Sequence, residues 1–186
     1  VPFGEFVPMR NIITTLIPPL SDLSMLQTDL IPGDSTAIFS TDSADIGSLI
    51  CFDSIYESLA RKSVGDGAEL ITVSTNDSWF SESAAIYQHN RHSVLRAVEN
   101  YRYVLRAANT GISSVISPVG EIISETKPLV KDYLIEDVYR VDCITLYTRI
   151  GDAILYVNLL LPIIIGVYLG IKKKIKKGQG TFNEKQ

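Results

Sequence analysis

The sequence is poor in the residues that form cross-links and metal sites. Its 186 residues include two cysteines, two histidines and one tryptophan, which excludes a small fold held together by disulfides. The 12 glycines and 8 prolines follow no period, and 46% of the residues are hydrophobic. Collagen-like and disordered chains are therefore excluded as well, and the composition is that of a globular domain.

Basic side chains are scarce outside the last fifteen residues. Residues 1–171 contain 11 Lys and Arg against 20 Asp and Glu, whereas residues 172–186 contain six Lys and one Glu. An acidic body repels phosphate groups, so no nucleic-acid partner is expected.

Charge is absent altogether from residues 153–171. In a helix these 19 residues extend about 28 Å, close to the thickness of the hydrocarbon core of a bilayer. A buried core helix is the alternative, but such helices usually keep a polar face, and Lys172 to Lys174 follow this run directly. We expect a transmembrane helix at 151–171. Because Lys-rich flanks stay in the cytoplasm, residues 172–186 are predicted to be a cytoplasmic tail, with residues 1–150 on the outer face of the membrane.

The body alternates apolar runs of strand and helix character. Strands are predicted by short, β-branched runs at 36–41, 46–51, 68–75, 112–118 and 121–126, and helices by wider spacing at 53–64 and 84–109. The second helix includes an apolar stripe from Ile86 through Val98 and Tyr101 to Ala108. This order predicts an α/β domain.

Cys51 is the candidate nucleophile. It ends one predicted strand and precedes a helix, where helix N–H groups can stabilise a thiolate. Taken alone, a cysteine at the end of a strand is more often a small buried apolar residue. However, Asn76, Asp77 and Trp79 follow the next strand, and the ends of neighbouring parallel strands meet at one crevice. These three residues are therefore candidates for a wall beside Cys51.

The two histidines, His89 and His92, lie three residues apart on a predicted helix. No third ligand with suitable spacing accompanies them, so we expect them to be structural and predict neither a metal nor a cofactor. Cys143 also lacks a partner pattern.

Five ordered motifs carry a resemblance to a known family. They are VPFGEFVP at 1–8, LICFD at 49–53, STNDSWF at 74–80, YQH at 87–89 and LYTRIGD at 146–152. Together with the terminal apolar run they resemble the apolipoprotein N-acyltransferases, a membrane-embedded branch of the nitrilase, or carbon-nitrogen hydrolase, superfamily. The resemblance implies the C-terminal part of a nitrilase-like α-β-β-α sandwich, here residues 1–150, followed by one transmembrane helix.

The same resemblance implies an activity. Cys51 would attack an acyl ester of a phospholipid, and the resulting thioester would pass its acyl chain to the α-amino group of the diacylglyceryl-cysteine of an apolipoprotein. Glu5 would assist by holding the active-site lysine, without acting as the general base. The substrate-binding positions would be Phe52, Asp53, Asn76 and Trp79. The complete protein would be a multi-pass protein of the cell inner membrane, with its catalytic domain in the periplasm.

Some features depart from the family pattern. The resemblance implies that the glutamate base and the lysine of the triad lie upstream of Val1, so this chain is expected to be an incomplete fragment. Phe52-Asp53 stands where Tyr-Glu is frequent, and Ser81 where Gly is common.

A loop at 17–31 is expected to act as a lid over the site. Two alternatives stay open, a membrane-tethered amidase of the nitrilase superfamily and a non-catalytic remnant.

Overall fold

The computed structural model describes residues 9, 12, 15, 30, 31, 33 and 35–183, with side chains up to Lys172. The chain divides into two compact units, Val1–Arg149 and Ile150–Gln186. The first unit contains the described strands, and the second contains the long C-terminal helix.

One mixed sheet organises the first unit. Its strands, in sheet order, are β1 (Ile38–Ser40), β2 (Asp45–Ile50), β3 (Leu70–Asn76), β4 (Val104–Asn109), β5 (Ser114–Ile116) and β6 (Ile122–Glu125). The central strands β2, β3 and β4 run parallel, and the remaining neighbours are antiparallel. The carboxyl ends of three parallel strands therefore lie at one edge of the sheet.

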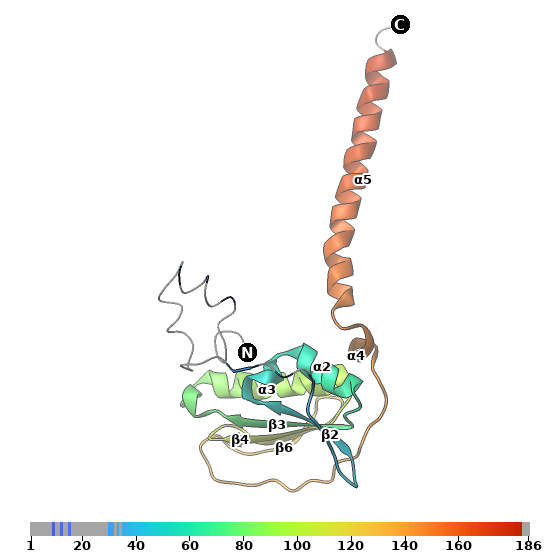
Figure 1. Cartoon of the computed structure of the whole chain (residues 1–186). Coiled ribbons are helices and arrows are strands. Elements are labelled where there is room, and N and C mark those ends of the chain that lie inside the picture. The colour runs from blue at the N-terminus through green and yellow to red at the C-terminus, as the bar shows by residue number, and fades with distance from the viewer. Residues whose placement is uncertain are drawn as a thin grey trace. The chain divides into compact units, whose positions relative to one another are not determined.

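Helices cover one face of this sheet. The two long ones, α2 (Glu57–Gly65) and α3 (Ala84–Asn100), lie against that face in Figure 1. The core between the layers is apolar and consists of Leu49, Ala60, Val64, Ala68, Ile71, Val73, Ala97, Val104 and Ile116. The opposite face is crossed by residues 127–145, which contain neither helix nor strand and lead into α4 (Leu146–Ile150). The expected α/β fold is confirmed.

Two predicted helices are shorter than expected. The helix predicted at 53–64 is a 3-10 turn, η2 (Cys51–Ile55), followed by α2, because Tyr56 between them is extended. The helix predicted at 84–109 is wrong in its last third. It ends at Tyr101, which adopts a left-handed conformation with φ 52° and ψ 56°. The residues beyond it form β4 instead, where Val104 pairs with Ile71 of β3.

The inward face of α3 is more polar than the predicted apolar stripe, of which Ile86 and Ala97 are buried. Val98 and Tyr101 of that stripe are 50% and 42% exposed. The side chains buried instead include His89, Asn90, Ser93, Arg96 and Asn100. Hydrogen bonds compensate for their burial. For example, Ser114 Oγ donates to Asn90 Oδ1 at 2.8 Å, and Arg96 Nη1 donates to the carbonyl oxygen of Ile55 at 2.7 Å.

The second unit is dominated by one long helix, α5 (Ala153–Asn183), which continues through Pro162. Its segment Ala153–Lys172 has a mean hydropathy of 2.3 and none of it is buried, so its length and composition suffice to cross a membrane. The apolar helix expected from the sequence is thus present.

Candidate active site

Cys51 is the first residue of η2 and directly follows β2, at a strand-to-helix turn as its position in the sequence indicates. Its φ angle is 52°, in the left-handed region that residues other than glycine rarely adopt. Holding a side chain there costs about 1–2 kcal/mol, so the surrounding contacts must stabilise the turn. The thiol is free, and the residue is partly exposed.

Two side chains bind the backbone of this turn. Asp53 Oδ2 accepts a hydrogen bond from the backbone N–H of Ile50 at 3.1 Å. On the other side of the cysteine, Ser54 Oγ donates to the carbonyl oxygen of Cys51 at 2.7 Å. Ser54 is fully buried. Ser54 therefore holds the peptide group that follows Cys51, and Asp53 holds the N–H of the residue before Cys51.

A buried histidine of α3 lies behind the same carbonyl. His89 Nε2 lies 3.3 Å from Ser54 Oγ and 3.4 Å from the Cys51 carbonyl oxygen. The imidazole ring packs against Phe52 and Phe80, with ring centroids 5.5 and 5.6 Å away, and 3% of the residue is exposed. The aromatic rings thus restrict access of water to the contact between His89 and the turn.

A buried ion pair completes the network behind His89. Asp77 Oδ1 lies 2.9 Å from His89 Nδ1, and Asp77 Oδ2 accepts from Arg106 Nη2 at 2.8 Å. Arg106 Nη2 also lies 3.0 Å from His89 Nδ1. Burial alone would raise the pKa of Asp77, but the hydrogen bond with His89, the Arg106 charge and the Thr75 hydroxyl together hold it below its usual range. Burial lowers the pKa of Arg106, and the charge of Asp77 opposes this shift. Asp77 is thus a buried anion.

Asp77, expected beside Cys51 as part of a wall, faces inward instead. The close approach of residue 111 explains part of its setting, because a Cβ on Gly111 would collide with the Asp77 carboxylate. Asn76 ends β3, and its Oδ1 accepts from Asn109 Nδ2 at 2.9 Å, which joins the ends of β3 and β4. Trp79, on η3 (Ser78–Phe80), is 68% exposed.

The predicted site residues come from two turns that lie next to each other. Phe52 of η2 and Phe80 of η3 approach with ring centroids 6.1 Å apart. Cys51, Phe52 and Asp53 therefore share one edge of the sheet with the turn that carries Asn76 and Trp79. Glu5 and nearly all of the predicted lid at 17–31 lie outside the described residues.

Sequence reasoning missed Ser54 and Arg106 and assigned His89 to the scaffold alone. One signal was available, because Ile86, His89, Asn90 and Ser93 recur at helical spacing. Within residues 35–172 and the few described ahead of them, no group of three His, Cys, Asp or Glu side chains could hold a metal ion.

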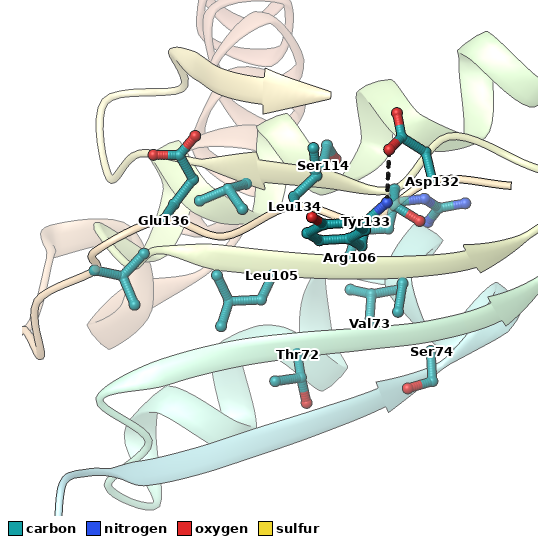
Figure 2. A pocket seen from close by; sticks show the side chains of 14 residues that line it. Thr72, Val73, Ser74, Leu105, Arg106, Ser114, Asp132, Tyr133, Leu134 and Glu136 are labelled. Carbon is teal, nitrogen blue, oxygen red and sulfur yellow. Dashed lines mark hydrogen bonds between the residues drawn. The ribbon is translucent and has the colours of Figure 1, made fainter. Parts of the chain in front are cut away.

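A separate cavity of about 590 Å³ lies on the face of the sheet opposite the helices (Figure 2). Side chains and backbone of β3, β4 and β5 line it on one side, and residues 132–138 line it on the other. Figure 2 shows Tyr133 and Leu134 over the strands, with the Tyr133 N–H bonded to Asp132 Oδ1. None of the predicted site residues lines this cavity.

Comparisons with known proteins agree with this arrangement. The family model described as carbon-nitrogen hydrolase matches residues 5–147. The apolipoprotein N-acyltransferase of Geobacter metallireducens is 40% identical over 153 residues, which are 82% of this chain and 28% of that protein. The protein of the same name from Gloeobacter violaceus is 33% identical over 182 residues, 98% of this chain and 34% of its own. The chain spans about a third of the length of these curated relatives.

A solved structure shares the fold. The NitN amidase from Nesterenkonia sp. AN1 superposes with a TM-score of 0.52 at 22% identity, covering 70% of this chain and 51% of the amidase.

Proposed function

The chain belongs to the carbon-nitrogen hydrolase family, and from this premise we propose that it forms the nucleophile-bearing part of an apolipoprotein N-acyltransferase. The similarity to the proteins of that name from Geobacter and Gloeobacter extends over 82% and 98% of the chain. The structural observation that supports the proposal most directly is the partly exposed Cys51 thiol at a left-handed strand-to-helix turn. Such turns present nucleophiles in other acyl-transfer enzymes.

The proposed reaction has two steps. In the first, the Cys51 thiolate attacks the carbonyl carbon of a phospholipid ester, the carbon–oxygen bond breaks, and the lysophospholipid oxygen takes up a proton. In the second, the α-amino group of the diacylglyceryl-cysteine of an apolipoprotein attacks the thioester carbon. The carbon–sulfur bond then breaks, the amine loses a proton, and the thiolate is restored. A covalent intermediate divides one difficult transfer between two lipids into two easier ones.

Other groups serve this thiolate in the proposal. The resemblance assigns the general base to a glutamate and the stabilising cation to a lysine, both from segments that precede residue 1, and gives Glu5 the role of holding that lysine. A cation beside the thiolate stabilises it and the oxyanion that forms during attack. We assign Phe52, Asp53, Asn76 and Trp79 to substrate binding, since they border the edge of the sheet where Cys51 lies.

The membrane is the proposed location of both substrates. Segment Ala153–Lys172 would span the inner membrane, with residues 1–150 in the periplasm and residues 172–186 in the cytoplasm. This arrangement gives the catalytic body access to the outer leaflet, where acyl donors and lipoproteins are embedded.

The test is acyl transfer by the protein expressed from its complete gene. With a phospholipid that carries a heavy-isotope acyl chain, we expect peptide mass spectrometry to find the acyl group on Cys51. Cys51→Ser should abolish this thioester and lower N-acylation by about 10³-fold or more, because the covalent step is lost. Cys143→Ser is the matched control, since that cysteine is exposed and its carbonyl oxygen binds Arg102, before the start of β4, whereas Cys51 follows the carboxyl end of β2.

Two outcomes would contradict the proposal. Triacylated lipoproteins in cells that carry only the Cys51→Ser protein would remove Cys51 from the mechanism. Release of the acyl group to water, with an amide as the preferred donor, would instead indicate the membrane-tethered amidase.

A further inference from the structure

We propose that Asp77, His89 and Ser54 form a positioning chain that holds the Cys51 carbonyl and thereby fixes the direction of the nucleophile. This inference rests on the proposed role of Cys51. It assigns a task to three buried polar residues that neither bind substrate nor belong to the expected triad.

The first argument is conformational. Cys51 adopts φ 52°, so its peptide group must be held against a backbone preference of about 1–2 kcal/mol. If this angle relaxes, rotation about the N–Cα bond moves the carbonyl group and the side chain of Cys51 together. Ser54 Oγ binds that oxygen at 2.7 Å, and His89 Nε2 lies within 3.4 Å of it. The strained angle is therefore held from inside the fold, while Cys51 itself stays partly exposed.

The second argument concerns the orientation of His89. Its Nδ1 contacts the Asp77 carboxylate at 2.9 Å, and this contact turns Nε2 toward Ser54 Oγ, 3.3 Å away. Arg106 and Thr75 hold the other lone pairs of Asp77 at 2.8 and 2.9 Å. Each link in this chain is thus oriented by the one behind it, as in sites where a carboxylate fixes an imidazole.

The third argument is burial. Asp77 and Ser54 are fully buried and His89 is 3% exposed, so water does not compete for these contacts. Burying a histidine and an aspartate is costly unless their polar atoms are hydrogen-bonded or paired, as they are here. Here the positioning chain leads from Asp77 through His89 and Ser54 to the backbone carbonyl of Cys51.

A pair of substitutions separates positioning from packing. The amide of His89→Asn can occupy the place of Nδ1 and keep the bond to Asp77, but it is too short to reach Ser54. The amide of His89→Gln can occupy the place of Nε2 and keep the contact with Ser54. His92→Asn is the matched control, because His92 lies one turn further along α3 and lines a surface hollow with Tyr87 and Leu95.

The measurement is the alkylation rate of Cys51 by iodoacetamide in the protein from the complete gene, followed on the Cys51 peptide by mass spectrometry. We expect His89→Asn to slow alkylation about tenfold and to lower kcat for acyl transfer by a similar factor, with KM unchanged, because a misplaced nucleophile loses rate and not binding. His89→Gln should recover most of the rate. Thermal unfolding midpoints of the two variants should be similar.

Ser54→Ala gives an independent check. Since Ser54 and His89 act on one carbonyl, the double variant with His89→Asn should lose little more rate than the slower single variant. Equal rates for His89→Asn, His89→Gln and the control would overturn the proposal, as would losses that only follow the unfolding midpoints. Alkylation does not depend on acyl transfer, so a slowed thiol in a protein without acyltransferase activity would refute the proposed function and leave the positioning chain intact.

Discussion

At the scale of single residues, the space around Asp77 is the most restrictive feature of the site. Gly111 passes so close to Asp77 that an added Cβ would lie 2.7 Å from the carboxylate carbon. The backbone and the side chain of Asp77 are both held in place. Its N–H donates to the carbonyl oxygen of Asn109 at 3.0 Å, and its carboxylate accepts from Arg106 at 2.8 Å. Neither the backbone nor the side chain of Asp77 can withdraw without breaking a buried bond.

We therefore predict that Gly111→Ala lowers the free energy of unfolding by about 2–3 kcal/mol, the cost of overpacking a tight site. It should also slow alkylation of Cys51, since displacement of Asp77 disturbs His89. Gly65→Ala is the control, because nothing beyond its chain neighbours and the backbone of its own helix lies within 4 Å of the position that its added methyl group would take. It should raise the free energy of unfolding by no more than about 1 kcal/mol. Denaturant unfolding of both variants checks this, and equal stabilities would show that Asp77 has room to move.

The sequence predicts the position of Cys51 but not the buried polar side chains that hold its turn in place. An apolar run that ends in cysteine and is followed by a helix start is a local pattern, and the strand-to-helix turn follows from it. Ser54, His89 and Arg106 come from three elements, and each is an ordinary polar residue in its own segment. Their burial depends on partners up to 42 positions away, as between Arg96 and Ser54, which no periodicity reveals.

At the scale of elements, the boundary between α3 and β4 shows where periodicity misleads. Val104, Leu105 and Ala108 continue a helical spacing from Val98 and also satisfy the requirements of a strand. Tertiary pairing decides between them, because β3 offers a parallel partner along the whole of β4. The left-handed Tyr101 separates the two elements without a glycine, so the usual signal for a helix end is missing.

Arg102, just after this boundary, ties the segment before α4 to the sheet. Arg102 is 2% exposed. Its guanidinium donates to three carbonyl oxygens, those of Ala68 at 2.8 Å, Tyr101 at 3.0 Å and Cys143 at 2.7 Å. We predict that Arg102→Met lowers the free energy of unfolding by about 3 kcal/mol, because three carbonyl oxygens lose a charged donor that is itself buried. Arg140→Met, at an exposed position, should have little effect. Loss of protection of the Cys143 region in hydrogen exchange would locate the damage; equal stability of the two variants would contradict the argument.

At the scale of the whole molecule, the two units carry different physical properties. Unit Val1–Arg149 has a helix-covered apolar core, whereas the described side chains of α5 from Ile154 to Ile171 are exposed and largely apolar. Exposed apolar surface of this extent is unfavourable in water and favourable in a bilayer. The sequence predicts this segment well, since an uncharged run needs no tertiary partner to be recognised.

The expected α-β-β-α sandwich has two sheets. In the described residues there is one sheet, so the second sheet and the helices that would cover it stay a prediction.

The orientation in the membrane is testable with the cysteines of the chain. The Lys-rich residues 172–177 are expected to stay in the cytoplasm, which puts the exposed Cys143 on the outer side. In spheroplasts, a membrane-impermeant maleimide should label Cys143 at once, whereas the thiol introduced by Gly178→Cys should react only after permeabilisation. The Cys143→Ser protein controls for labelling elsewhere on the body. The reverse labelling pattern would mean that residues 1–150 lie in the cytoplasm. Labelling of both sites in intact spheroplasts would mean that α5 does not span the membrane, because a helix that crosses the bilayer leaves its two ends in separate compartments.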